Sequence, residues 1–154
     1  FCGTAPIHML YGLREALDML AEEGLPAIIA RHDRLASAIR AAVEVWCDGD
    51  GGGGMAFNAL VPDERSNSIT AIRVPPGFDA EEVRTVARER YQVAMGGGLE
   101  QLKGDVFRIG HMGDLNEPMV LGALAGIEAA LQTLHVPHGR GGVAAAIDYL
   151  VAQG

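Results

Sequence analysis

Hydrophobic residues recur at helical spacing in the first 46 residues of the chain. A helix is expected over residues 7–24, with one apolar face that consists of Leu10, Leu13, Leu17 and Leu20. Gly24 can take the left-handed conformation that ends a helix, and Pro26 suits the first turn of the next one. The second helix should run to Trp46, with an apolar stripe of Leu35, Ile39, Val43 and Trp46. Its solvated side is predicted to carry Arg31, Asp33, Arg34, Arg40 and Glu44.

From residue 48 onward, the pattern predicts both strands and helices. Strands are expected over residues 55–61 and 68–74, separated by a turn, and Asp79 opens a helix with Glu82 as a capping box. A short strand is predicted over 91–95, ended by the glycines 96–98, and another over 106–111. Helices should follow at 116–134 and 143–151. We therefore expect an α/β fold: residues 1–47 form an N-terminal helical section, and 48–154 form a small domain with a mostly antiparallel sheet and helices on one face.

The predicted helix at 116–134 has the clearest periodicity, with a stripe of Val120, Leu124, Ile127, Leu131 and Leu134. Gly122 and Gly126 would allow a neighbouring element to approach this helix closely. In the strand before it, side chains alternate between two faces, so Arg108 should lie opposite Phe107 and Ile109. On a face without helices, its guanidinium could hold a carboxylate through two parallel hydrogen bonds, or it could be an ordinary surface arginine.

Composition narrows the class of protein. The 154 residues are 49% hydrophobic and 21% charged, as in a soluble globular domain that needs no disulfide or metal. A net charge of −8 argues against nucleic acids and anionic membranes as partners, and no apolar stretch is long enough for a membrane helix. Eleven arginines and one lysine, Lys103, carry the positive charge. Cys2 and Cys47 lack a CxxC pattern, which favours reduced thiols in a cytoplasmic protein.

Several other residues suit structural roles better than chemistry. The glycine-rich segment 49–54 lacks the context of a phosphate-binding loop and favours a flexible connection. His111 and Asp114 have the spacing of an acid–base pair, but Asp114 or Asn116 as the cap of the next helix is favoured.

Metal binding and hydrolysis are poorly supported. His135 and His138 lack the third and fourth ligands of a zinc site. Ser66 has no GxSxG context, and the two cysteines have no histidine framework, so neither a serine nor a cysteine nucleophile is indicated.

Longer runs of residues carry a family resemblance. They are TAP at 4–6, LYGLREAL at 10–17, ERSN at 64–67, MGGGL at 95–99, KG at 103–104, FRIGHMGDLNE at 107–117 and PHGRGG at 137–142. Together they resemble the C-terminal portion of class V (fold-type-I) aminotransferases, which use pyridoxal phosphate (PLP), and in particular the serine–glyoxylate and alanine–glyoxylate group. The resemblance covers the whole chain but only about the last two-fifths of such an enzyme, so we expect a part of a longer protein.

The resemblance implies a cytoplasmic homodimer that moves an amino group from serine or alanine to glyoxylate. By position, Arg108 matches the arginine that binds the substrate carboxylate, and Thr4 matches a residue that reaches the PLP phosphate of the other subunit. The glycines 96–98 match a segment near the substrate cleft. Phe1 falls where some relatives have a phosphate-binding tyrosine, and its phenyl ring cannot donate a hydrogen bond.

The catalytic residues of such an enzyme are expected elsewhere. A PLP enzyme needs a lysine for the Schiff base and an acid beside the pyridinium nitrogen. In this family both lie upstream of Thr4, and Lys103 sits in a turn, so we expect this portion alone to bind neither PLP nor a metal and to be inactive. The alternatives are a non-catalytic module that binds small molecules and a module that only dimerises.

Overall fold

The structure, a computed structural model, describes residues 3–49 and 54–153. The predictions for Phe1, for Cys2 and for positions 50–53 of the glycine-rich segment lie outside these residues. The chain divides into two compact units, Phe1–Arg31 and His32–Gly154. Within the described ranges, no helix has both the length and the apolar character needed to cross a bilayer.

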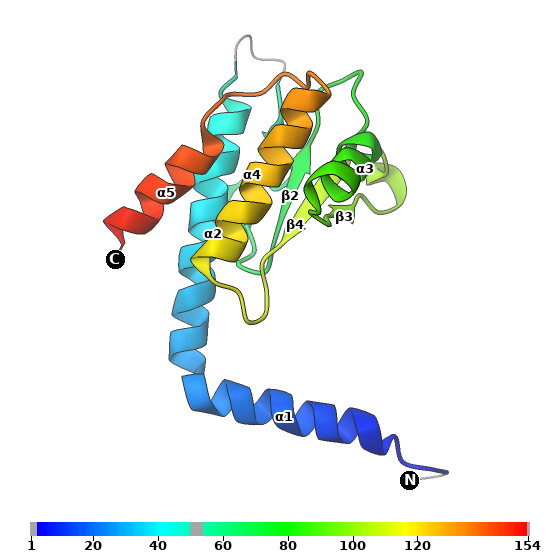
Figure 1. The fold of residues 1–154 in the computed structure, drawn as a ribbon, viewed down its shortest axis with the longest axis vertical. Coiled ribbons are helices and arrows are strands. Elements are labelled where there is room, and N and C mark those ends of the chain that lie inside the picture. Colours follow the sequence, from blue (N-terminus) through cyan, green and yellow to red (C-terminus); the bar gives the residue numbers. More distant parts are fainter. Residues whose placement is uncertain (1–2, 50–53, 154) are drawn as a thin grey trace. The chain divides into compact units, whose positions relative to one another are not determined.

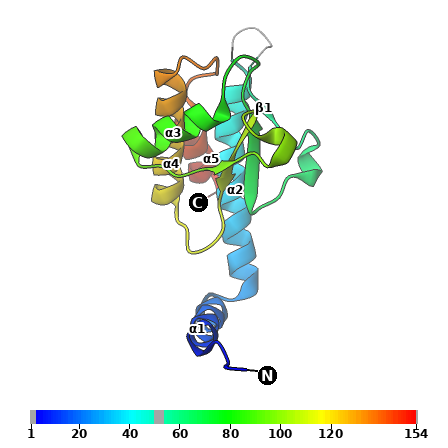
Figure 2. The ribbon, with the colours of Figure 1, turned by 90° about the vertical axis from the view of Figure 1, so that its right-hand side faces the viewer.

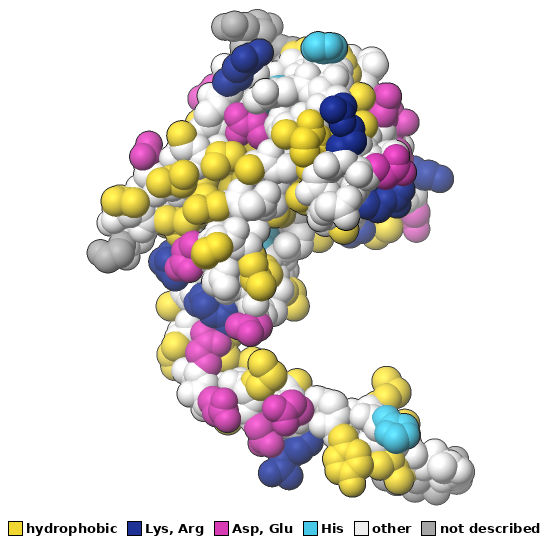
Figure 3. All heavy atoms as spheres, in the orientation of Figure 1, with side chains coloured by type: hydrophobic (Ala, Val, Ile, Leu, Met, Phe, Trp, Pro, Cys, Tyr) yellow, Lys and Arg dark blue, Asp and Glu magenta, His cyan; other side chains and the backbone are white. Residues whose placement is uncertain are grey.

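The first unit consists of helix α1 (Ile7–Glu23) and the start of α2 (Leu25–Cys47). Gly24, with φ = 82°, separates the two helices, as predicted. No residue of α1 is buried, although one side of it is rich in large apolar residues. Hydrophobic side chains lie along α1 among acidic ones (Figure 3). The exposed apolar residues of α1 are Ile7, Met9, Leu10, Tyr11, Leu13, Leu17, Met19 and Leu20.

In the second unit, α2 contributes the predicted stripe of Leu35, Ile39, Val43 and Trp46, each at most 1% exposed. The prediction that Arg40 lies on a solvated side is wrong. Its side chain is half-buried, and its Nη2 donates to the carbonyl oxygen of Ser66 at 2.9 Å and to Oδ1 of Asn67 at 2.6 Å. The ERSN turn is therefore attached to α2 through this arginine.

The sheet of the second unit has four antiparallel strands in the order β1-β2-β4-β3. They are β1 (Ala56–Phe57), β2 (Ile69–Arg73), β3 (Gly96–Gly97) and β4 (Val106–Gly110). One face of the sheet is covered by α2, α3 (Ala80–Tyr91) and α4 (Glu117–Thr133), and α5 (Gly142–Ala152) packs on α4 (Figures 1 and 2). The predicted fold class is therefore confirmed.

Two predicted strands differ from the structure. The strand expected over 55–61 is reduced to two residues, and a 3-10 turn follows at Pro62–Glu64. The strand expected over 91–95 is absent, because Tyr91 ends α3 and Gln92 takes a left-handed conformation (φ 59°). Two of the three glycines expected to end that strand, Gly96 and Gly97, instead form β3, since β4 offers them an edge to pair with. Pairing with a neighbour overrides the low strand propensity of glycine.

The register of the sheet places Phe57, Ile72 and Phe107 side by side on one face. All three are buried, together with the apolar stripes of α2 and α4. Gly126 permits the predicted close approach, because a Cβ there would lie 2.5 Å from Cγ2 of Val93. Nothing in the described chain lies within 4 Å of a Cβ at Gly122, so that part of the prediction is wrong.

Side-chain caps fix the starts of α3 and α4. Oδ1 of Asp79 accepts a hydrogen bond from the backbone N–H of Glu81 at 2.8 Å. Oδ1 of Asn116 accepts one from the N–H of Met119 at 3.1 Å, so Asn116 rather than Asp114 is the cap. Each cap satisfies a donor that the first turn of a helix leaves without a partner.

Candidate functional site

Arg108 lies in the middle of β4, on the sheet face opposite the helices. It is in register with Ala71 of β2 and with Gly96 of β3, so these three residues share one face. Its neighbours Phe107 and Ile109 point to the other face and are buried, as the alternation predicted. The side chain of Arg108 is half-buried rather than fully exposed.

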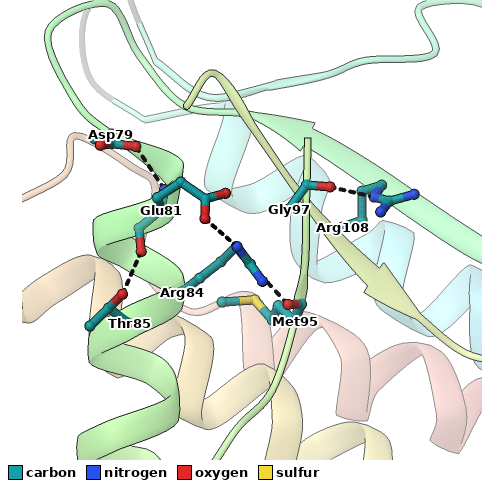
Figure 4. Close-up of polar contacts among 7 residues, drawn as sticks. All are labelled: Asp79, Glu81, Arg84, Thr85, Met95, Gly97 and Arg108. Carbon is teal, nitrogen blue, oxygen red and sulfur yellow. Dashed lines mark hydrogen bonds and ion pairs between the residues drawn. The ribbon is translucent and has the colours of Figure 1, made fainter. Parts of the chain in front are cut away.

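The guanidinium of Arg108 has a carbonyl partner but no acid. Its Nε donates to the carbonyl oxygen of Gly97 at 2.7 Å (Figure 4). Arg73 on the same face pairs with Asp105, and Arg84 pairs with Glu81. Within residues 3–49 and 54–153, no acidic side chain forms an ion pair with Arg108. A half-buried cation without a counter-ion is suited to bind an anion, and the planar guanidinium matches a carboxylate.

A side chain at each of the glycines 96–98 would meet a different neighbour. A Cβ at Gly96 would lie 3.3 Å from Nε and 3.5 Å from Nη2 of Arg108. A Cβ at Gly97, on the helix side, would lie 2.6 Å from Oε1 of Glu81, and one at Gly98 would collide with the carbonyl of Leu102. Only Gly98 thus excludes a side chain against backbone, whereas a Cβ at Gly96 or Gly97 would require the side chains of Arg108 or of Glu81 and Arg84 to move.

His111 and Asp114 do not form an acid–base pair. His111 is fully buried: its Nδ1 lies 3.0 Å from the carbonyl oxygen of Asn67, and its Nε2 lies 3.0 Å from Oγ1 of Thr70. Asp114 is exposed. Burial lowers the pKa of His111, aided by the charges of Arg40 and His32 and opposed by the hydrogen bond to Asn67. The imidazole is thus a neutral structural bridge between β4 and the ERSN turn.

His138 and Cys47 are two further residues of the second unit that could carry chemistry. Nδ1 of His138 lies 2.6 Å from the carbonyl oxygen of Val136. In the part of the chain that the structure describes, no group of three or more His, Cys, Asp or Glu residues could hold a metal ion. Cys47 is a free, half-buried thiol, and burial, together with the charge of Asp48, raises its pKa to about 11.

Lys103 and Thr4 are the two residues of this chain that bear on a PLP site, and both are exposed. Lys103, the single lysine of the sequence, is exposed at the end of the 3-10 turn Glu100–Leu102. Thr4 is exposed in the first unit, two residues before Pro6, the N-cap of α1.

Two groups of supporting residues were missed by the analysis of the sequence. Arg84 and Glu81 are on α3, on the side of β3 that faces this helix. In the sequence, their i, i+3 spacing indicates only an ion pair within a helix. Glu128 lies within the apolar stripe of α4 and is 8% exposed. An acid between Ile127 and Leu131 is a signal that a buried partner exists, but the sequence does not identify that partner.

Comparisons with known proteins agree with this architecture. No family model matches the sequence. It is 47% identical over 148 residues to the serine–glyoxylate aminotransferase of Arabidopsis thaliana, covering 96% of this chain and 35% of that protein. It is 42% identical over 147 residues to the L-aspartate–glyoxylate aminotransferase of Paracoccus denitrificans, covering 95% and 35%. The crystal structure of pyridoxamine–pyruvate aminotransferase from Mesorhizobium loti matches all of this chain and 38% of its own, with a TM-score of 0.88 and 32% identity.

These similarities define the class of protein. The chain has the fold of the C-terminal region of the PLP-dependent aminotransferases, and it spans about a third of the length of the curated relatives that it matches. Within that class it belongs to the family that contains the serine–glyoxylate aminotransferases, of which it is a C-terminal portion. This assignment confirms the family resemblance of the sequence and does not favour a non-catalytic module.

Proposed function

We propose that the protein containing this chain transfers an amino group from serine or alanine to glyoxylate, with Arg108 binding the carboxylate of each substrate. The observation that supports this most directly is the half-buried guanidinium of Arg108, which lies on the helix-free face without an acidic partner in the described chain. Amino donor and keto acceptor both carry a carboxylate, so one cation can orient both.

PLP would supply the electron sink of the reaction, and its lysine and acid would come from residues outside this chain. We propose that Thr4, an exposed residue, contacts the cofactor phosphate of the partner subunit in a cytoplasmic homodimer. Residues 1–47 would then be the end of the large domain and its connecting helices, and 48–154 the small domain. The exposed apolar residues of α1 support this proposal, because contiguous apolar patches mark interaction surfaces.

The carboxylate site is tested by Arg108→Ala in the full-length enzyme. Loss of a charge-assisted, bidentate contact should raise KM for both serine and glyoxylate by about 10-fold or more. Arg73→Ala is the matched control, because Arg73 lies on the same face but already pairs with Asp105. An unchanged KM for both substrates in Arg108→Ala would contradict the proposed role.

The inactivity of the isolated chain has its own test. We expect the purified 154-residue chain to develop no absorbance from bound PLP and to show no transaminase activity. A PLP absorbance band that disappears in the Lys103→Ala variant would show that this interpretation is wrong.

A further inference from the structure

The side of β3 that faces α3 is occupied by an ion pair. Nη1 of Arg84 pairs with Oε2 of Glu81, and Nε of the same arginine donates to the carbonyl oxygen of Met95 at 2.9 Å (Figure 4). Met95 directly precedes β3. One planar side chain thus connects the first turn of α3 to the start of the edge strand.

Glu81 is itself held in place. Its backbone N–H donates to Asp79, and its carbonyl oxygen accepts from Oγ1 of Thr85 at 2.9 Å. A carboxylate in the first turn of a helix is also favoured by the helix dipole. The backbone of Glu81 is therefore fixed at the start of α3. Arg84, which pairs with Glu81 and donates to Met95, links this fixed point to the start of β3.

The opposite side of the same two-residue strand touches Arg108. The carbonyl oxygen of Gly97 accepts from Nε of Arg108 at 2.7 Å, and Gly96 leaves room for the guanidinium. Arg84 and Arg108 therefore contact β3 from the α3 side and from the opposite face, and neither contact uses a side chain of β3. Any shift of this short strand would move the acceptor that orients Arg108.

We propose that Arg84 is a positioning residue for the carboxylate site: through Met95 and β3 it holds the Gly97 carbonyl against Nε of Arg108, so that Nη1 and Nη2 are left to bind the substrate carboxylate. This inference rests on the proposed function, because it assumes that Arg108 binds substrate. It adds a residue on α3 that does not touch the substrate. It also specifies that the carboxylate meets the end of the guanidinium fork rather than its Nε side.

The experiment uses the full-length enzyme and two substrates, serine and serinol, in which a hydroxymethyl group replaces the carboxylate. The ratio of kcat/KM for serine to that for serinol measures how well the carboxylate is recognised. Arg84→Met should lower this ratio by about 10-fold, mainly through KM for serine and with kcat little changed, since a small misplacement of an orienting group has effects of this size. A merely structural defect would lower kcat/KM equally for serine and for serinol, so their ratio would stay unchanged.

Arg88→Met is the matched control, because Arg88 lies on the same helix and its ion pair among the described residues is with the exposed Glu89. Arg84→Lys is the second variant in case Arg84→Met does not fold. A lysine keeps the charge beside Glu81 but cannot also offer a guanidinium Nε to Met95, so it should lower the ratio as well.

The outcomes separate this inference from the proposed function. If Arg108→Ala leaves the ratio unchanged, the carboxylate site itself is wrong. If Arg108→Ala lowers the ratio but folded Arg84→Lys and Arg84→Met behave like Arg88→Met, the positioning role alone is overturned.

Discussion

The Oε2 atom of Glu128 accepts a hydrogen bond from the indole Nε1 of Trp46 at 3.2 Å, across 82 positions of sequence. The same carboxylate accepts from the backbone N–H groups of Gly141 at 2.9 Å and Val143 at 3.2 Å. Glu128 thus joins α2, α4 and the start of α5 at one point. Burial raises the pKa of Glu128, but these three donors outweigh it and hold the pKa below the usual 4.5.

Removal of this carboxylate should destabilise the domain. Glu128→Ala leaves the Trp46 indole and two backbone donors without their acceptor, so we expect a loss of about 2–3 kcal/mol in the free energy of unfolding. Urea denaturation measures it, with Glu89→Ala on the exposed side of α3 as control. Equal stabilities of the two variants would contradict the assigned role of Glu128.

The lowered pKa of Glu128 also predicts a pH dependence. A carboxyl group with a lower pKa in the folded state contributes stability that is fully present above the unfolded value of 4.5. That contribution is lost as the pH falls through the lower, folded pKa. The Glu128→Gln variant should lack this contribution. The difference in free energy of unfolding between the native chain and the variant, measured by urea denaturation, should therefore shrink as the pH is lowered from 6 to 3.

His111 should titrate below its ordinary pKa of 6.5, because burial disfavours its charged form. Since the carbonyl of Asn67 can only accept, Nδ1 should carry the proton and Nε2 should accept from Thr70. The unfolded chain binds this proton more readily, so the His111 contribution to stability should fall as the pH drops below 6.5. NMR of the imidazole nitrogens checks both points, and an Nε2–H tautomer or a midpoint above 6.5 would refute them.

Gly126 and Gly122 on α4 should respond oppositely to alanine. Gly126→Ala places a Cβ 2.5 Å from Cγ2 of Val93, and overpacking of this kind costs about 1–3 kcal/mol. Gly122→Ala meets nothing within 4 Å in the described chain and should stabilise the helix by up to about 1 kcal/mol. Thermal unfolding measures the change in stability that each substitution causes. If both variants were equally stable, Val93 would not contact α4 as described.

The Cys47 thiol should be nearly unreactive in the folded chain. With a pKa of about 11, its thiolate fraction at pH 8 is about 100-fold below that of an ordinary cysteine. A Cys2→Ser variant isolates this thiol, and alkylation by iodoacetamide should accelerate by about that factor in urea. Rapid alkylation without denaturant would show that Cys47 is not protected.

Periodicity was sufficient to predict the helices and the direction of Arg108. The stripes of α2 and α4 and the glycine between α1 and α2 depend on local chemistry, which the sequence contains directly. Alternation in β4 follows from strand geometry alone, so the face of Arg108 required no knowledge of its neighbours.

Features that depend on distant partners could not be predicted in this way. Gly96 and Gly97 form a strand only because β4 lies beside them, and local propensity indicated the opposite. The burial of His111 and Glu128 depends on Thr70 and Trp46, and no spacing rule links these positions. Arg84 resembled a surface ion-pair residue because its contact with Met95 is made through backbone.

The bare main chain of β3 has a consequence for redesign of the enzyme. Next to Arg108, the wall formed by β3 is peptide alone, so it offers no side chain to exchange for a larger or smaller one. Side chains introduced at the glycines 96–98 would displace Arg108, displace the Glu81–Arg84 pair or collide with the carbonyl of Leu102, so randomising them would disturb the site rather than reshape it. Substitutions intended to change the amino donor should instead be made at residues outside β3 that lie near the guanidinium of Arg108.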